Sequence, residues 1–325
     1  MTLLNTIRAD GMGDVNALEF VGVDWGTSTF RAWYCKSGEA PVQIHKSDMG
    51  MSKLRRNEFA PYLEKILSSK GISCSAPVII CGMAGARDGW REVPYVSVPA
   101  CLEDIINNAA HVTAGRYGCT ILPGVCIAEE GRFDVMRGEE TLLFGAISNG
   151  VRDGIFCLPG THSKWCQIEC GNLVSWQTVM TGELFALLST ASTLSQFCGS
   201  IRSELFDKTV FRNAVHEVLA QPASAMHKLF SIRARALLDP EADIYDFSSR
   251  LSGLLIGQEI AGVHLDESDL VFLIASGPIR EAYSSAIKIS GSKVETIAAD
   301  TSAIAGLSLF AHGLLKSNKA ASRAQ

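Results

Sequence analysis

Two short segments of the chain combine glycine with hydroxyl side chains in a way that suits phosphate binding. The first begins at Asp24 and continues with Gly26, Thr27, Ser28 and Thr29. Backbone N–H groups and hydroxyls in such a turn can bind an anion. Because Asp24 would repel a phosphate, its natural role is to hold a hydrated Mg²⁺ ion. The alternative is a solvated turn in which Asp24 accepts local backbone hydrogen bonds.

The second segment lies in the other half of the chain and consists of Gly160, Thr161, His162, Ser163 and Lys164. A glycine, two hydroxyls and a cation suit the outer phosphates of a nucleotide. Lys164 could instead be a solvated strand residue and His162 a plain turn residue, because Gly-Thr is common in turns. The two similar segments therefore predict either two ordinary hairpins or a duplicated α/β unit that holds a nucleotide across a cleft.

An acidic segment between the two turns offers groups for proton transfer. Asp134, Arg137, Gly138, Glu139 and Glu140 precede or begin an expected helix. One of the carboxylates could take the proton of a substrate hydroxyl as it attacks phosphorus, and Arg137 could bind an anionic substrate. The alternative is simple capping, since carboxylates stabilise the positive N-terminus of a helix.

Two further loops follow apolar runs that read as buried strands. Arg87, in the first loop, could bind a substrate carboxylate as a fork or be an ordinary loop cation. Ser276, Gly277 and Pro278, in the second, could pack against a nucleobase or form a plain strand-to-helix turn with proline near its start. Ligands bind at the carboxyl ends of strands in open α/β sheets, so a binding role is possible for both loops, and both alternatives stay open.

Alternating strands and helices are expected to position these residues. Apolar runs predict strands at 18–24, 30–36, 42–47, 77–81, 120–122, 155–158, 164–169, 173–179 and 270–275. Helical spacing predicts helices at 58–69, 139–147, 279–287 and 301–315, and through most of 182–262. The length predicts two α/β domains, at 18–150 and 151–315, with the last helix packing back on the first domain. Residues 1–17 are expected to be a loose extension and residues 316–325 a polar tail.

Composition excludes several classes of protein. The chain has 325 residues, 47% of them hydrophobic, and a net charge of −5 without any block of like charge. These values are typical of a globular protein and argue against nucleic acid or a membrane as a partner. The start of the chain has no export signal, and the ten cysteines are scattered without metal-ligand spacing. A cytoplasmic protein with reduced cysteines is expected.

Taken together, the chain resembles the 2-dehydro-3-deoxygalactonokinase family of the actin/hexokinase/Hsp70-like superfamily. Segments specific to that family are CLPGTHSKW (157–165) and MRGEET (136–141), the latter within the matching segment DVMRGEETLLFGAI (134–147). The other matching segments are VDWGTSTFRAW (23–33), CGMAGARDGWREVPYVSVPA (81–100), MTGELFALL (180–188), SGPIREAY (276–283) and TSAIAGL (301–307).

The resemblance implies two ribonuclease-H-like (actin-like ATPase) domains with a central cleft. It further implies Mg²⁺-dependent transfer of phosphate from ATP to the C6 hydroxyl of 2-dehydro-3-deoxy-D-galactonate. Asp24 and residues 27–29 would form the first phosphate motif, residues 160–164 the second, and residues 276–278 the adenosine side.

The catalytic base falls within the acidic segment. Glu139 is favoured because it follows Gly138 as the base follows glycine in related sugar kinases, while Asp134 and Glu140 stay open. Arg87 and Arg137, together with Arg31 and Glu140, would bind the sugar acid.

Three readings stay open at this point. They are this kinase, a kinase for another sugar acid or a ketose, and a non-catalytic actin-like ATP-binding regulator. A homodimer is also left open.

Overall fold

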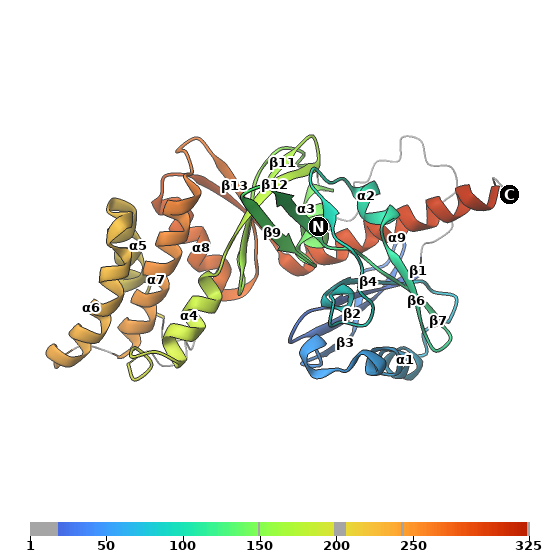
Figure 1. The fold of residues 1–325 in the computed structure, drawn as a ribbon, viewed down its shortest axis with the longest axis horizontal. Coiled ribbons are helices and arrows are strands. Elements are labelled where there is room, and N and C mark those ends of the chain that lie inside the picture. The colour runs from blue at the N-terminus through green and yellow to red at the C-terminus, as the bar shows by residue number, and fades with distance from the viewer. Residues whose placement is uncertain (1–18, 149, 198–205, 242–243, 324–325) are drawn as a thin grey trace. The chain divides into compact units, whose positions relative to one another are not determined.

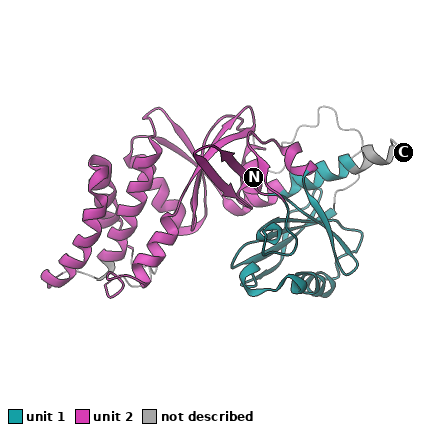
Figure 2. Ribbon diagram, in the orientation of Figure 1, with its two compact units in different colours: residues 1–93, 108–123, 307–325 teal, residues 94–107, 124–306 magenta. Residues whose placement is uncertain are grey.

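The structure, a computed structural model, describes residues 19–148, 150–197, 206–241 and 244–323, and the expected extension at 1–17 lies outside these ranges. The chain divides into two compact units (Figure 2). Unit 1 comprises residues 1–93, 108–123 and 307–325, and unit 2 comprises residues 94–107 and 124–306. Residues 124–150 thus group with unit 2, although the sequence placed the boundary at 150. Within the described ranges, no helix has both the length and the apolar character needed to cross a lipid bilayer.

The sheet of unit 1 has the strand order β3-β2-β1-β4-β7-β6 (Figure 1). The first three strands form an antiparallel meander, and β4 and β7 add to it in parallel. Strand β6 closes the edge in antiparallel fashion. The bounds are β1 Glu19–Trp25, β2 Phe30–Lys36, β3 Val42–Ser47, β4 Val78–Gly82, β6 Ala110–Ala114 and β7 Tyr117–Ile121.

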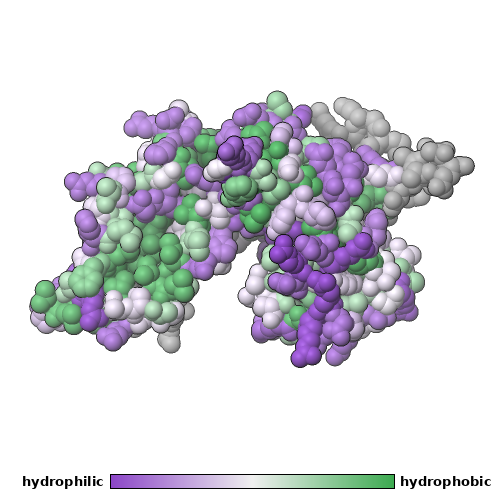
Figure 3. Space-filling model, viewed as in Figure 1, coloured by the Kyte–Doolittle hydropathy of each residue, from purple (hydrophilic) through white to green (hydrophobic). Residues whose placement is uncertain are grey.

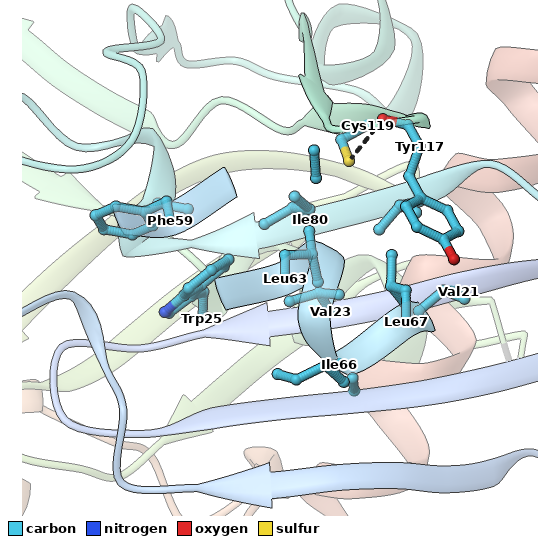
Figure 4. Close-up of a cluster of buried hydrophobic side chains, with 14 of the residues drawn as sticks. Val21, Val23, Trp25, Phe59, Leu63, Ile66, Leu67, Ile80, Tyr117 and Cys119 are labelled. Atoms are coloured by element: carbon cyan, nitrogen blue, oxygen red, sulfur yellow. Dashed lines mark hydrogen bonds between the residues drawn. The ribbon is translucent and has the colours of Figure 1, made fainter. Parts of the chain in front are cut away.

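The core of unit 1 lies between this sheet and α1 (Phe59–Ser69) (Figure 4). Helix α1 forms where the sequence places apolar residues on one helical face, and Phe59, Leu63, Ile66 and Leu67 are buried. The ring of Trp25, at the end of β1, packs 4.8 Å from that of Phe59. The strand that ends in the first glycine turn is therefore fixed by the core.

The main sheet of unit 2 repeats the order of the first. Its strands run β12-β11-β10-β13-β14, again an antiparallel meander followed by two parallel strands. The bounds are β10 Gly154–Leu158, β11 Ser163–Glu169, β12 Asn172–Val179, β13 Leu270–Ile274 and β14 Lys293–Ile297. The expectation of two ribonuclease-H-like α/β units is confirmed, and each glycine turn joins the first two strands of its sheet.

The two hairpins also place a basic residue at corresponding positions. In unit 1, Asp24 on β1 pairs in register with Arg31 on β2. In unit 2, Leu158 on β10 pairs with Lys164 on β11. Arg31 and Lys164 thus each pair with a residue near the end of the strand that precedes the turn.

The remaining elements of unit 2 include a small sheet, β5-β8-β9, that the sequence analysis did not predict. Its strands are β5 Val96–Ser97, β8 Val125–Glu129 and β9 Arg132–Met136, with α2 at Leu102–Asn107. The helices are α3 Glu139–Ile147, α4 Thr181–Thr190, α5 Lys208–Ala220, α6 Ala225–Leu238, α7 Ile244–Val263 and α8 Gly277–Ile289. Short 3-10 helices also occur in both units. Those of unit 1 are η2 Met51–Lys53, η3 Arg56–Glu58 and η4 Met83–Gly85, and unit 2 contains η6 Pro222–Ser224.

The last helix, α9 (Ala299–Arg323), is longer than expected. It continues through residues 316–323, which the sequence analysis assigned to a polar tail. Its residues up to 306 group with unit 2, and those from 307 group with unit 1.

Candidate active site

The first glycine turn is held by backbone hydrogen bonds and has exposed side chains. Its ends are closed by a hydrogen bond from Gly26 N–H to the carbonyl of Thr29 at 2.8 Å. The backbone N–H groups of Met51 and Ser52 donate to the carbonyls of Gly26 and Thr27, both at 3.0 Å. Residues 27–29 are exposed. The turn therefore presents three hydroxyl residues on a supported backbone, as the phosphate prediction requires.

Asp24 and Arg31, which the sequence analysis gave separate roles, form an ion pair. Arg31 donates from Nη2 at 2.5 Å and from Nε at 3.2 Å, both to Asp24 Oδ2. Both side chains are partly buried, with 15% of Asp24 and 24% of Arg31 exposed. Arg31 thus neutralises the carboxylate that was predicted to hold Mg²⁺.

The donor set of unit 1 still suits a nucleotide-bound Mg²⁺ ion. No group of three or more metal-binding side chains occurs in the described part of the chain. A Mg²⁺ ion that accompanies a nucleotide needs only one or two carboxylates, because water and phosphate oxygens complete its octahedron. Asp24, at the end of a buried strand and beside an exposed turn, fits that requirement.

Arg87 lies in the loop that follows β4 and η4. Its side chain is 86% exposed, and its Nε lies 3.7 Å from Glu92 Oε1. An exposed pair of this kind is weak and easily exchanged. The guanidinium is therefore available for another carboxylate.

The second glycine turn is fixed against the start of α4. A hydrogen bond of 3.0 Å runs from Glu183 N–H to the carbonyl of Thr161. A Cβ at Gly182 would lie 2.3 Å from the carbonyl oxygen of Gly160, so only glycine allows this approach. His162 Nε2 and Glu183 Oε2 lie 2.6 Å apart, which orients the imidazole at the surface of the turn.

Ser163 and Lys164, at the end of this turn, point in opposite directions as neighbours on a strand must. The hydroxyl of Ser163 is fully buried and lies 2.8 Å from that of Tyr283. It therefore faces the interior rather than a phosphate, contrary to its predicted role. Lys164 is only 3% exposed, and its Nζ lies 3.7 Å from Glu139 Oε1 and 3.3 Å from the carbonyl of His162.

The two glutamates at the start of α3 have different surroundings. Gly138, with a φ of 109°, turns the chain into the helix. Glu139 Oε2 accepts a hydrogen bond from Arg137 N–H at 3.1 Å, and 33% of its side chain is exposed. Glu140 is fully buried and accepts hydrogen bonds from Gly138 N–H at 2.6 Å and the Thr141 hydroxyl at 3.2 Å.

The environment of Glu140 favours its neutral form. Burial raises the pKa of its carboxyl group to about 8, and the neighbouring charge of Glu139 acts in the same direction. A buried carboxyl whose bonds go to its own turn supports the loop. The structure thus gives Glu140 a structural role in place of the predicted substrate contact, and leaves Glu139 as the carboxylate that a substrate can reach.

Asp134, the third acidic candidate, is engaged by backbone and hydroxyl donors. Thr178 donates its N–H to Oδ2 at 2.9 Å and its hydroxyl to Oδ1 at 2.7 Å. Val135 N–H also donates to Oδ1, at 2.7 Å. These bonds join β9 to β12, so Asp134 holds two sheets together and is a poor candidate for the base.

Arg137 is 8% exposed and its guanidinium carbon lies 4.3 Å from the centre of the Tyr95 ring. This cation–π contact fixes the side chain beside the start of α3. A guanidinium held in this position suits an anionic substrate, and its substrate-binding role stays a prediction.

A pocket of about 520 Å³ lies in the helical part of unit 2, next to the second turn. Figure 3 shows hydrophobic side chains gathered on this part of the unit. Gly160 and Pro278 line the pocket, whereas Ser276 precedes it as the N-cap of α8 and accepts a hydrogen bond from Ala299 N–H at 3.2 Å. Much of the wall is apolar, formed by Phe185, Phe206, Phe211, Leu255, Ile256, Ile279 and Ala282.

Sequence reasoning missed most of this wall. Thr181, Gly182 and Phe185 belong to the segment MTGELFALL, which was quoted without a site role. Lys208 and Glu281 also line the pocket, and Lys208 Nζ lies 3.3 Å from Glu281 Oε2. A flat apolar pocket with a few polar groups is suited to a nucleobase and its sugar.

Comparison with known proteins identifies relatives along nearly the whole chain. Residues 24–310 match the family described as 2-keto-3-deoxy-galactonokinase. A relative from Rhizobium meliloti (strain 1021), named as a 2-dehydro-3-deoxygalactonokinase, is 37% identical over 91% of this chain and 97% of its own. The 2-dehydro-3-deoxygalactonokinase of Escherichia coli (strain K12) is 31% identical over 91% of this chain and 98% of its own.

The fold also matches a solved structure. A crystal structure from Sinorhizobium meliloti, titled as a 2-dehydro-3-deoxygalactonokinase, superposes with a TM-score of 0.85 at 35% identity. The match covers 91% of this chain and 99% of that one.

Proposed function

This chain belongs to the 2-keto-3-deoxy-galactonokinase family, and on that premise we propose that it phosphorylates the C6 hydroxyl of 2-dehydro-3-deoxy-D-galactonate with ATP. One arrangement in unit 2 carries the proposal. The second glycine turn lines the apolar pocket through Gly160, and its last residue, Lys164, lies 3.7 Å from Glu139. A nucleoside pocket, a phosphate-binding turn and a candidate base thus follow one another along a single surface.

In this proposal the pocket binds adenosine and the turn binds the outer phosphates. Thr161 and the backbone N–H groups of the turn donate to phosphate oxygens, and Lys164 offsets charge on the transferred group. Pro278 at the start of α8 contributes to the adenosine side. Phosphoryl transfer needs little covalent help from the protein, so alignment and charge neutralisation supply most of the rate.

Glu139 acts as the general base. Its carboxylate takes the proton of the C6 hydroxyl while the hydroxyl oxygen bonds to the γ-phosphorus. The bond from that phosphorus to the bridging β–γ oxygen breaks, and ADP leaves with the electron pair. Arg137, held against Tyr95 in unit 2, binds the carboxylate of the sugar acid. Arg87 of unit 1 is a separate candidate for this contact.

Asp24 would hold a hydrated Mg²⁺ ion, which neutralises charge on the phosphates when it is bound. The exposed residues Thr27, Ser28 and Thr29 form the phosphate-binding side of that turn. The sequence analysis expected Arg31 to bind the sugar acid, but in this proposal it pairs with Asp24 instead. Its role is to hold that carboxylate in place.

The substrate is tested with purified protein in a coupled assay for ADP, with Mg-ATP and a panel of 2-keto-3-deoxy sugar acids and ketoses. We expect the highest kcat/KM for 2-dehydro-3-deoxy-D-galactonate. A preference for a ketose would support the alternative of a different sugar kinase, and ATP binding without turnover of any acceptor would support a regulator. The buried cation Arg137, in the segment that leads into α3, favours an acidic substrate over a ketose.

Two further properties belong to the proposal. The chain forms a homodimer through α6, where Met226, Phe230 and Leu237 are each more than half exposed at helical spacing. Light scattering after gel filtration tests the mass.

A cytoplasmic location agrees with the nine described cysteines, all of which are free thiols.

A further inference from the structure

A buried carboxylate lies behind the second glycine turn. Glu259 of α7 is 3% exposed. Trp165 donates its indole N–H to Oε1 at 2.7 Å, and Tyr283 donates its hydroxyl to Oε2 at 2.6 Å. The side chain also forms hydrogen bonds with Thr181 and Ser163. One carboxylate of α7 therefore joins β11, α4 and α8.

The hydrogen bonds of this cluster have a defined direction. The indole of Trp165 can only donate, and an ionised carboxylate can only accept. Tyr283 gives its single proton to Glu259, so its oxygen can only accept from Ser163, 2.8 Å away, and the single proton of Ser163 is shared between that oxygen and the carboxylate. The carboxylate thus determines the orientation of hydroxyls as far as the glycine turn.

Three of the four partners of Glu259 also lie next to the proposed nucleotide site. Ser163 directly precedes Lys164 on the strand. Thr181 and Tyr283 line the 520 Å³ pocket. Thr181 also begins the helix whose next residue, Gly182, lies against the carbonyl of Gly160. No other side chain described above contacts both walls of the pocket and the turn.

Keeping a carboxylate in this place is costly. Burial raises the pKa of the Glu259 carboxyl group, and the four hydrogen bonds lower it. An apolar cluster of the same volume would avoid the desolvation cost. Buried polar networks that are fully hydrogen bonded hold their elements in one arrangement, which apolar contacts do far less specifically.

We propose that Glu259 is a positioning residue for ATP binding, which locks the second glycine turn, the start of α4 and the start of α8 into one rigid geometry. This inference rests on the proposed function, since it takes the turn and the pocket as the ATP site. Glu259 itself touches neither phosphate nor base. It acts through Ser163, Thr181 and Tyr283.

The test compares Glu259→Gln and Tyr283→Phe with wild type in the full-length protein. An amide at 259 must direct its oxygen to the Trp165 N–H, so its NH₂ faces Tyr283 and reverses the hydroxyl chain. We expect the Kd for ATP, measured by calorimetry, and the KM for ATP to rise about tenfold. The KM for the sugar acid should stay within about twofold, because the sugar acid does not contact this cluster.

A matched control separates positioning from general stability. Glu217→Gln breaks the paired hydrogen bonds of Glu217 with Arg250, at 3.0 and 2.9 Å, in the same helical region. This variant should lose thermal stability and keep its ATP constants. If Glu259→Gln lowers Tm like the control but leaves the Kd and KM for ATP unchanged, Glu259 is merely structural and the inference is wrong.

The two single variants and their double variant provide a second check. Because Tyr283 and Glu259 act in one chain, the double variant should weaken ATP binding less than the product of the single effects. Independent, multiplicative effects would contradict the inference. Should Glu259→Gln fail to fold, Tyr283→Phe alone decides, since it removes only one oxygen.

Lys164→Met distinguishes failure of this inference from failure of the proposed function. If Lys164→Met leaves ATP binding and turnover unchanged, the turn is not the phosphate site and the proposed function fails. If Lys164→Met impairs them while Glu259→Gln behaves like Glu217→Gln, the site stands and only the positioning role fails.

Discussion

Glu139 and Glu140 are neighbours in the sequence, yet their carboxylates lie in opposite environments. Glu139 is one-third exposed and 3.7 Å from the ammonium group of Lys164, whereas Glu140 is fully buried and bonded to its own turn. The backbone of a helix start explains the difference, because consecutive side chains leave a helix about 100° apart. One glutamate is therefore left for chemistry and the other for structure, and each assignment can be tested.

Glu139→Gln should abolish most of the catalysis and leave binding intact. The amide keeps the volume and hydrogen-bonding capacity of the side chain but cannot accept the substrate proton. A fall in kcat of about 10²–10⁴-fold is expected, with little change in either KM. Steady-state kinetics of the purified variant measure both constants. A variant with wild-type kcat would remove Glu139 from the mechanism.

Glu140→Gln should change how stability depends on pH. In the folded protein the Glu140 carboxyl has a pKa of about 8, whereas its ordinary value is 4.5. Between these values the folded state binds more protons than the unfolded state, so the free energy of unfolding falls as pH rises. The glutamine side chain does not titrate, so the free energy of unfolding of the variant does not fall for this reason as pH rises. Relative to wild type it should gain a few kcal/mol, on the order of two to five, between pH 5 and pH 9.

Urea denaturation at several pH values measures this gain. Glu169→Gln, which changes an exposed carboxylate at the end of β11, serves as the control and should follow wild type at every pH. Parallel curves for Glu140→Gln and wild type would show that the buried carboxyl does not titrate in this range.

Asp134→Asn should reduce stability more than it reduces turnover. An amide can replace only part of the three hydrogen bonds from Thr178 and Val135, because its NH₂ cannot accept. A loss of about 1–3 kcal/mol in the free energy of unfolding is expected. The kcat at a temperature well below Tm should stay close to wild type. A loss in kcat as large as that of Glu139→Gln would instead make Asp134 the base.

Asp24→Ala should abolish turnover while the protein stays folded. Without the carboxylate the proposed Mg²⁺ ligand is lost, and Arg31 adds positive charge in its place. Circular dichroism checks the fold, and a titration with Mg²⁺ at fixed ATP checks the metal dependence. Turnover like that of wild type would rule out the metal role. Arg31→Met, which keeps Asp24, should retain measurable Mg²⁺-dependent activity.

Arg87→Ala should raise the KM for the sugar acid far more than the KM for ATP. The exposed guanidinium is predicted to bind the substrate carboxylate, and its contact with Glu92 at 3.7 Å is too weak to matter for folding. The melting temperature should therefore be unchanged. Equal changes in the two KM values would contradict the assignment.

Most strands of the two main sheets could be predicted because they are short apolar runs. The run of Val78 to Cys81 is an example, since all of it is buried. Strands β6 and β14 were not predicted, because polar and exposed residues interrupt their apolar ones. Strand β9 was not predicted, because its polar–apolar alternation covers only five residues, and the face formed by Phe133 and Val135 is exposed and packs into no core. Its partner β8 supplies the pairing that the local pattern does not show.

The candidate site was predictable as a set of motifs and not as a set of contacts. The ion pair of Asp24 with Arg31 depends on the register of β1 with β2, and the sequence analysis gave these two residues separate roles. The inward direction of Ser163 depends instead on Tyr283, which lies 120 residues away. The wall of the pocket likewise arises from the packing of four helices, which no local spacing encodes.

The two hairpins differ in the residue that pairs with the cation across the ladder, and this difference affects the net charge at each glycine turn. In one copy the residue facing the cation across the ladder is an acid, so the charge of Arg31 is compensated by Asp24 within the hairpin. In the other copy the facing residue is Leu158, which leaves the charge of Lys164 uncancelled by its own ladder partner and directed toward Glu139. The ladder partner of the cation, an acid in one hairpin and a leucine in the other, therefore determines whether its charge is compensated within the hairpin.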